Sequence, residues 1–216
     1  MGQILTANVA TSMYWLGIYL ERVETTLNHI NKAYDDIIDV DKDAGVKLYK
    51  NFSIDLEYSD AVDFLDKAIR GDHSANLAEI LKNARENAII GREYIESSAF
   101  GEIIELNETA QKISKSITPI DYKDIDYALS LISEIRGAQT KRGDRNVSDY
   151  FLQLGKLVEE LDFHIRFEND PTMKSIITQE ITTVITRLNP ELDFTIPNDG
   201  ETMDYIYKLI DKLIVN

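Results

Sequence analysis

The chain has 216 residues, and its 38 acidic and 23 basic side chains leave a formal charge of −15. With 44% hydrophobic residues it can bury a core, which excludes a disordered acidic tail. Its acidity disfavours nucleic acid and anionic lipid as partners, since both bind clustered Lys and Arg. The lack of cysteine excludes disulfides and thiolate sites, and no long apolar run indicates a membrane span. We therefore expect a soluble, cytoplasmic protein.

The first element that the sequence predicts is a long helix from about Ala7 to Asp39. Its apolar residues follow steps of four and three, which is the 3.5-residue repeat of helices packed in bundles. At about 1.5 Å per residue, such a helix is roughly 50 Å long and spans a whole bundle. The apolar row consists of Val9, Met13, Leu16, Leu20, Val23, Leu27, Ile30, Tyr34 and Ile37.

The remaining chain predicts shorter helices separated by turn and capping residues. A polar connection is expected over residues 41–51, and further helices at about 62–69, 77–95, 100–113, 119–137, 146–168, 171–188 and 201–215. The expected boundaries are the N-cap Ser59-Asp60, the stop Gly71, the cap Ser74, and the cap and first-turn proline Thr118-Pro119. Strand-like alternation is absent. We predict an all-α, single-domain bundle (1–216) of about six to eight helices.

Two of the predicted helices carry a similar pattern 138 residues apart. The aligned positions are Leu16-Gly17 with Leu154-Gly155, Glu21 with Glu159, and Glu24 with Asp162. Because the matches include both apolar and acidic positions, we expect equivalent helices related by an internal pseudo-twofold axis. Glycine lets a neighbouring helix approach closely. The helices carrying Gly17 and Gly155 are therefore predicted to be neighbours.

Acidic residues form a second row beside the apolar one, with Glu21 and Glu24 on the first helix and Glu159 and Asp162 on its counterpart. Together with nearby arginines they are the candidate site. Carboxylates in a low-dielectric site must meet cations, share protons or face water. Arg85 and Arg92 lie seven residues apart on one helix face, so we expect one of them among the partners. A salt-bridge network, a ligand or substrate site, and a Mg²⁺, Ca²⁺ or Mn²⁺ site all remain open. The candidate polar cluster is Glu21, Arg22, Glu24, Arg85, Asn87, Arg92, Glu159 and Asp162.

Several familiar chemistries do not fit the spacing. A ferritin-like di-iron site needs Glu-x-x-His on two helices, whereas Glu24 and Asp162 occupy the positions of those histidines. The chain has no Gly-x-Ser-x-Gly elbow and no glycine-rich phosphate loop. We therefore assign no metal centre, no cofactor and no catalytic residue.

Two further features could meet a ligand or partner. Tyr14, Trp15 and Tyr19 flank the first apolar row, where core packing, a ligand wall and a homo-oligomer contact are alternatives. The basic segment 141–145 is interpreted as a solvated loop, with a landing point for an anion as the alternative.

Three motifs resemble a bacterial family, the alpha-E domain proteins. The segment from Met13 to Thr26 is similar to the family's opening helix, which reads Tyr-Trp-Leu-Gly-Arg and then Leu-Glu-Arg-Ala-Glu. The segment from Arg85 to Ala88, with Arg92, is similar to its central Arg-Glu-Asn-Ala-Arg. The segment from Phe151 to Asp162 is similar to its late Phe-Leu-x-Leu-Gly-Arg and Glu-Arg-Ala-Asp. Together the motifs reach from residue 13 to about residue 166.

The resemblance implies a fold and a set of partners. Ile18 and Lys156 replace arginines of the family pattern, and Glu160 replaces the arginine of the second Glu-Arg. Alpha-E domains are often encoded or fused beside ATP-grasp amide ligases and transglutaminase-like proteins. The resemblance thus implies an accessory or substrate-binding component of a peptide-modifying or amide-modifying system. An enzyme that uses the Glu/Arg cluster for amide transfer or hydrolysis, and a purely structural interaction module, are the alternatives.

Overall fold

The structure is a computed structural model that describes residues 5–140, 145–167, 171–197 and 200–215. Throughout these ranges the regular structure is helical, with nine α-helices and one short 3₁₀ helix, so the all-α prediction is confirmed and the helix count slightly exceeds the predicted range. In chain order the elements are α1 (Ala7–Asp39), α2 (Ala44–Lys50), α3 (Ala61–Arg70), α4 (Leu77–Ile90), η1 (Arg92–Tyr94), α5 (Ser97–Lys115), α6 (Tyr122–Thr140), α7 (Val147–Arg166), α8 (Pro171–Leu188) and α9 (Thr202–Val215).

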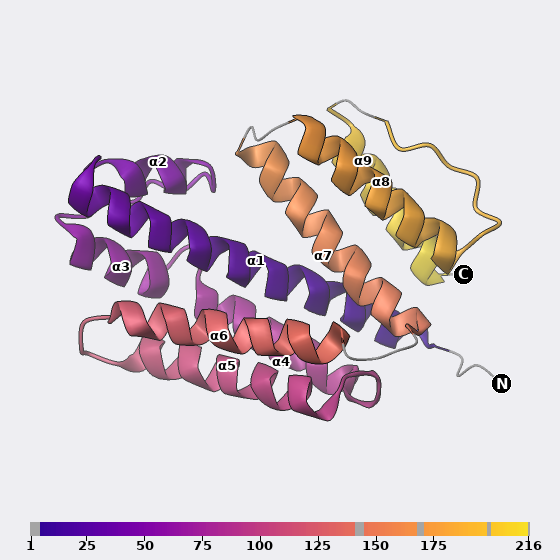
Figure 1. Ribbon diagram of the computed structural model, residues 1–216, viewed down its shortest axis with the longest axis horizontal. Coiled ribbons are helices and arrows are strands. Elements are labelled where there is room, and N and C mark those ends of the chain that lie inside the picture. Colours follow the sequence, from indigo (N-terminus) through magenta and orange to yellow (C-terminus); the bar gives the residue numbers. More distant parts are fainter. Residues whose placement is uncertain (1–4, 141–144, 168–170, 198–199, 216) are drawn as a thin grey trace.

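The long helix α1 is the centre of the arrangement (Figure 1). Helices α4, α5 and α6 lie on one side of it, and α7 crosses it on the other side, with α8 and α9 beyond (Figure 1). The small helices α2 and α3 lie at the C-terminal end of α1. Helix α1 thus contacts both halves of the molecule, as a helix of this length should.

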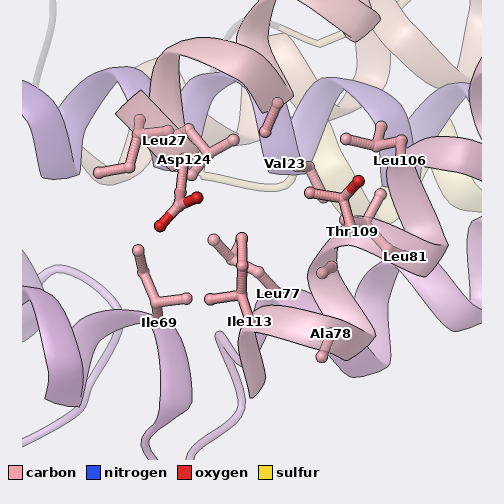
Figure 2. Close-up of a pocket in the computed structure, with 13 residues that line it drawn as sticks. Val23, Leu27, Ile69, Leu77, Ala78, Leu81, Leu106, Thr109, Ile113 and Asp124 are labelled. Carbon is pink, nitrogen blue, oxygen red and sulfur yellow. The ribbon is translucent and has the colours of Figure 1, made fainter. Parts of the chain in front are cut away.

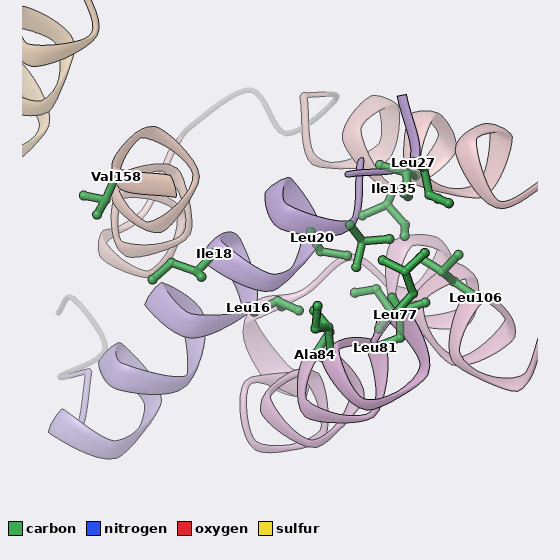
Figure 3. Packing of buried hydrophobic residues seen from close by; sticks show 14 of the residues in the cluster. Leu16, Ile18, Leu20, Leu27, Leu77, Leu81, Ala84, Leu106, Ile135 and Val158 are labelled. Carbon is green, nitrogen blue, oxygen red and sulfur yellow. The ribbon is translucent and has the colours of Figure 1, made fainter. Parts of the chain in front are cut away.

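The predicted apolar row of α1 forms the core. Met13, Leu16, Leu20, Val23, Leu27, Ile30 and Ile37 are buried, and Val9 and Tyr34 are partly buried against them. Figure 3 shows Leu16 and Leu20 directed at α4, where Ala84 and Leu81 lie, whereas Ile18 is directed at α7. The Thr6 hydroxyl caps the helix by accepting a hydrogen bond from the Val9 amide at 3.4 Å. The sequence therefore places both ends and the buried face of α1 correctly.

The contact between α1 and α7 depends on two glycines. A Cβ atom on Gly17 would lie 2.9 Å from the Lys156 amide nitrogen and closer still to the Leu152 carbonyl oxygen. A Cβ atom on Gly155 would lie 3.1 Å from the Ile18 amide nitrogen and closer still to the Tyr14 carbonyl oxygen. The prediction that these two helices are neighbours is confirmed. The two contacts are also reciprocal. Gly17 meets the residues three before and one after Gly155, and Gly155 meets the residues three before and one after Gly17, at a constant offset of 138 residues.

Several predicted boundaries differ from the structure; α4, for example, ends at Ile90 and α5 begins at Ser97. Helix α2 lies within the stretch expected to be a polar connection, and α4 is capped by the Asn76 side chain rather than by Ser74. Helix α6 begins at Tyr122, after Thr118-Pro119. Tertiary contacts explain α2, because the buried Tyr49 hydroxyl donates to the Ala68 carbonyl oxygen at 2.8 Å. Because tertiary contacts stabilise this short helix, its own sequence gives only a weak indication of helical structure.

The last two helices extend the core beyond α7. Helix α8 packs along α7, and α9 contacts α1. The side chains of Ile206, Leu209 and Ile210 in α9 join the same hydrophobic cluster as the apolar row of α1. No helix in the described ranges is long and apolar enough to cross a membrane.

Candidate functional site

The predicted acidic residues lie beside the contact between α1 and α7. Glu21, Arg22 and Glu24 project from α1 just after the glycine contact, and Glu159 and Asp162 project from α7. Glu21 and Glu159 are buried, with 7% and 4% of their surface exposed. A carboxylate this deeply buried needs a partner.

Glu21 is paired with an arginine of α6. The Arg136 Nη2 atom lies 2.5 Å from Glu21 Oε2 and 3.1 Å from Glu24 Oε2, and Arg136 Nε also donates to Glu24 Oε2 at 3.2 Å. The other oxygen, Glu21 Oε1, accepts a hydrogen bond from the Thr25 hydroxyl at 3.4 Å. Burial raises the pKa of Glu21 above its ordinary value, although the charge of Arg136 acts in the opposite direction. This group links α1 to α6.

Arg22 is paired with α7 instead. Its Nε and Nη2 atoms donate to the two oxygens of Glu159 at 2.6 and 2.7 Å, which is the bidentate arrangement of a guanidinium on a carboxylate. Burial would lower the pKa of Arg22, but the hydrogen bonds and charge of Glu159 outweigh that effect and raise it. One turn further along, Asp162 pairs with Arg166 at 2.6 Å. The first pair links α1 to α7, and the second lies within α7.

The two networks are separate because adjacent residues of an α-helix point about 100° apart. Glu21 therefore reaches α6 while Arg22 reaches α7. The four acidic residues of the candidate cluster form ion pairs with three arginines, Arg136, Arg22 and Arg166. Among the described residues no group of three or more His, Asp or Glu is arranged to hold a metal ion.

The expectation that Arg85 or Arg92 pairs with these carboxylates is wrong for the described part of the chain, where the partners are Arg22, Arg136 and Arg166. Arg85 is half-buried on α4, and the Arg92 guanidinium lies over the Phe100 ring at 5.1 Å. Asn87 donates to the Asn83 carbonyl oxygen of its own helix at 2.8 Å. Helix α4 turns Ala84 and Ala88 toward the core, so Arg85 does not face the core, and Arg92 lies beyond α4 in η1.

Sequence reasoning missed Arg136, although a signal was present. Arg136 directly follows the buried Ile135, as Glu21 follows the buried Leu20. Both side chains therefore stand beside the apolar row of their own helix. Because both residues directly follow a buried apolar residue, the sequence could have indicated that Glu21 and Arg136 lie at the same interface.

Arg136 also borders a cationic cavity between α6 and α7. This α6–α7 cavity has a volume of about 240 Å³. Its lining residues are Arg136, Gln139, Thr140, Arg145, Asp149, Leu152, Gln153 and Lys156. The wall thus carries three cationic side chains and one carboxylate, and the Asp149 carboxylate accepts the Asn146 amide in a capping box.

Donors remain available in the α6–α7 cavity. The Gln139 side-chain nitrogen is buried and has no hydrogen-bond partner among the described residues. Arg145 donates to Gln153 Oε1 at 2.7 Å, and Lys156 lies 3.5 Å from Glu160. Of the predicted basic segment only Arg145 is described, and residues 141–144 lie outside the described ranges. The cavity is therefore suited to an anion.

A second cavity lies in the apolar interface between α1, α3, α4, α5 and α6 (Figure 2). Its walls are almost entirely apolar, with Ile69, Leu77 and Ile113 facing Val23 and Leu27, and its volume is about 30 Å³. Figure 2 shows the Asp124 carboxylate at its edge. A space of this size holds only one or two water molecules, so it is a packing gap of the core.

The comparisons with known proteins agree with this arrangement. Searches of curated proteins and of solved structures returned no match. The model of the Alpha-E family, described as a predicted alpha-helical domain with a conserved ER motif, matches residues 5–184. The chain contains one Glu-Arg dipeptide, Glu21-Arg22, which is the pair that joins α1 to α6 and to α7. This protein is a member of the Alpha-E family.

Proposed function

We propose that this protein is the accessory, substrate-binding component of an ATP-grasp-linked system that forms or modifies amide or peptide bonds. Family membership and the α6–α7 cavity support this role. An amide ligase joins a carboxylate to an amine, so a companion domain that binds carboxylates would deliver one of the two substrates. Such a ligase consumes ATP, which fits the cytoplasmic location expected from the sequence. An ATP-grasp ligase or a transglutaminase-like protein is the expected partner.

The observation that carries this proposal is the charge of the α6–α7 cavity. Three cationic side chains meet there in a protein whose net charge is −15. Arg136 is held in place by Glu21 and Glu24, so it does not need to be ordered when a ligand binds. Lys156 and Arg145 retain N–H donors that face the same space. A ligand with several carboxylates would satisfy these groups.

The proposal is tested with an acetylated Glu-Glu dipeptide and its uncharged Gln-Gln amide counterpart. We expect calorimetry to show binding of the acidic peptide only. Lys156→Gln and Arg145→Gln should each weaken that binding by about tenfold or more, the value of a charged hydrogen bond. Lys82→Gln on the exposed surface of α4 is the matched control. Equal binding of both peptides, or unchanged binding by both cavity variants, would refute the carboxylate site.

The partner is tested separately. We expect the ATP-grasp ligase of the same genome to be retained by the immobilised chain and to consume ATP faster in its presence. A ligase that neither binds nor responds would remove the accessory role while leaving the carboxylate site intact.

A purely structural module is the second candidate, because the ion pairs of Glu21-Arg22 join three helices. Glu21→Gln distinguishes the two. A large loss of thermal stability with unchanged peptide binding would favour the structural module, and near-native stability with lost binding would place Glu21 in a working site.

We also infer that α1 and α7 are related by a local twofold axis. The reciprocal contacts of Gly17 and Gly155 support this relation. The parallel spacing of Glu21 and Glu159 after those glycines is consistent with it.

A further inference from the structure

A cavity of about 270 Å³ lies at the C-terminal end of α7, away from Arg136 and the α6–α7 cavity. It is bounded by α1, by α7, and by the loops that precede α3 and α4. We call it the α1–α7 cavity. The residues that matter for its chemistry are Arg22, Thr26, Phe52, Glu159, Phe163 and Arg166.

Both arginines of the α1–α7 cavity keep hydrogen-bond donors to spare. A guanidinium has five N–H groups. Arg22 uses two nitrogens on Glu159, and Arg166 uses one on Asp162. About a third of the Arg22 side chain and nearly half of the Arg166 side chain remain exposed. Their unused N–H groups are thus open to an oxygen acceptor.

Thr26 gives an independent indication of a missing acceptor. This residue lines the α1–α7 cavity, only 1% of its surface is exposed, and its hydroxyl has no hydrogen-bond partner among the described residues. Buried hydroxyls are nearly always paired, since an unpaired one costs free energy. An oxygen of a ligand in the cavity would supply the partner.

Two phenylalanines form another part of the wall, beside Ser74 and Ala75. The rings of Phe52 and Phe163 meet edge to face with their centroids 5.9 Å apart. Phe167 stacks on Phe163 at 5.5 Å, and the His29 ring lies 4.7 Å from Phe167. Such rings favour an aromatic or branched apolar group of a ligand.

The balance of charge selects the anion. Arg22 and Arg166 are each tied to one carboxylate, so the α1–α7 cavity carries little net charge. A dianionic phosphate would be repelled by Glu159 and Asp162, whereas one carboxylate can use the spare N–H groups. In the α6–α7 cavity, by contrast, Arg145 donates to the neutral Gln153 side chain instead of a carboxylate.

We propose that the α1–α7 cavity binds a monocarboxylate carried on an aromatic or branched apolar group, such as the C-terminal residue of a peptide. The carboxylate would meet Arg166, Arg22 and Thr26, and the apolar group would lie on Phe52 and Phe163. This site is separate from the one in the proposed function and does not depend on it.

The test uses three related probes: N-acetylphenylalanine, N-acetylphenylalaninamide and inorganic phosphate. We expect calorimetry with the full chain to show binding of N-acetylphenylalanine, and no binding of N-acetylphenylalaninamide, in which an uncharged amide replaces the carboxylate. Tighter binding of phosphate than of N-acetylphenylalanine would overturn the assigned ligand class. Equal binding of the amide would overturn the role of the carboxylate.

Variants locate the probe. Arg166→Gln should weaken binding of N-acetylphenylalanine by about tenfold to a hundredfold, and Thr26→Val by several-fold, because each removes a hydrogen bond to a charged group. Arg166 lies in a half-exposed pair and the Thr26 hydroxyl is unpaired, so both variants should melt within a few degrees of the wild-type temperature. The control Arg145→Gln changes only the α6–α7 cavity. If Arg145→Gln weakens binding and Arg166→Gln does not, the probe occupies the α6–α7 cavity. That outcome would overturn this inference and leave the proposed function standing.

Discussion

The glycine contact between α1 and α7 gives the sharpest test of the fold. In an exposed helix, Gly→Ala stabilises by about 0.5–1 kcal/mol, because alanine loses less backbone entropy on folding. At Gly155 the added Cβ would lie 2.9 Å from the Tyr14 carbonyl carbon, and at Gly17 it would lie 3.1 Å from the Leu152 carbonyl carbon. These neighbours are backbone atoms, so no side-chain rotation can relieve the overlap and the helices must move apart.

Overpacking of this kind costs about 1–3 kcal/mol. Allowing for the gain in helix propensity, we expect Gly17→Ala and Gly155→Ala each to destabilise by a net ~1–2 kcal/mol. For a chain of this length that lowers the melting temperature by about 2–8 °C. The double variant should cost less than the sum of the two, because one separation of the helices relieves both contacts.

Gly101 supplies the matched control. It lies in α5, it is exposed, and no atom would lie within 4 Å of an added Cβ. Gly101→Ala should therefore raise the melting temperature by about 1–4 °C, as a gain of about 0.5–1 kcal/mol implies. Thermal unfolding followed by circular dichroism compares all four variants. If Gly17→Ala and Gly155→Ala are stabilised like Gly101→Ala, α1 and α7 do not approach closely.

Two further predictions concern the ion pairs. Glu159→Gln leaves Arg22 without an ionic partner and should destabilise the protein by about 2–4 kcal/mol in a urea titration, somewhat less than for a fully buried pair because a third of Arg22 is exposed. In the same titration Asp162→Asn should cost at most about 1 kcal/mol, because nearly half of its partner Arg166 is exposed. Burial raises the pKa of Glu21 in the native chain, so its contribution to stability is fully present below the unfolded pKa and is lost as pH rises through the native pKa. Wild-type stability relative to Glu21→Gln should therefore increase as pH falls from 7 through that window, and a decrease would contradict the raised pKa.

Local signals predict much of the fold because they are strong in the long helices. The apolar row of α1 and the proline at the start of α8 place those helices at Ala7–Asp39 and Pro171–Leu188. The cap of α7 at Asn146 is likewise a local side-chain effect. Helix α2 was missed because seven residues cannot form a stable helix alone, and Tyr49 and Gly45 hold it through contacts with residues far along the chain.

The site was predicted in part for a similar reason. Spacing along α1 and along α7 identified Glu21, Glu24, Glu159 and Asp162, which all form ion pairs in the structure. The choice of arginine depends on which helices are adjacent and how they are rotated, and one sequence does not contain that information. Arg136 comes from α6, which lies beside α1 only after the chain between them has folded back.

The equivalence of positions 138 residues apart in α1 and α7 also explains why Glu21 pairs with Arg136. Arg22 of α1 pairs with Glu159 of α7, so the equivalent pair would join position 160 of α7 to Glu21 of α1. Position 160 holds glutamate, and Glu160 lies near Lys156 instead. Glu160 is still close enough to Glu21 for its charge to raise the Glu21 pKa, behind burial as the main cause. We therefore infer that Arg136 of α6 takes the place of the cation that position 160 of α7 would supply if α7 were fully equivalent to α1.

This explanation predicts a rescue. Arg136→Met leaves the buried Glu21 without its arginine and should destabilise by up to about 3–5 kcal/mol. Adding Glu160→Arg should recover part of that loss, with a coupling energy of about 1–3 kcal/mol in a double-mutant cycle measured by urea unfolding. Glu160→Gln is the control, because it removes the repulsion of Glu21 without providing a new cation. If arginine at 160 restores no more stability than glutamine does, α1 and α7 are equivalent at the glycine contact but not at the ion pairs.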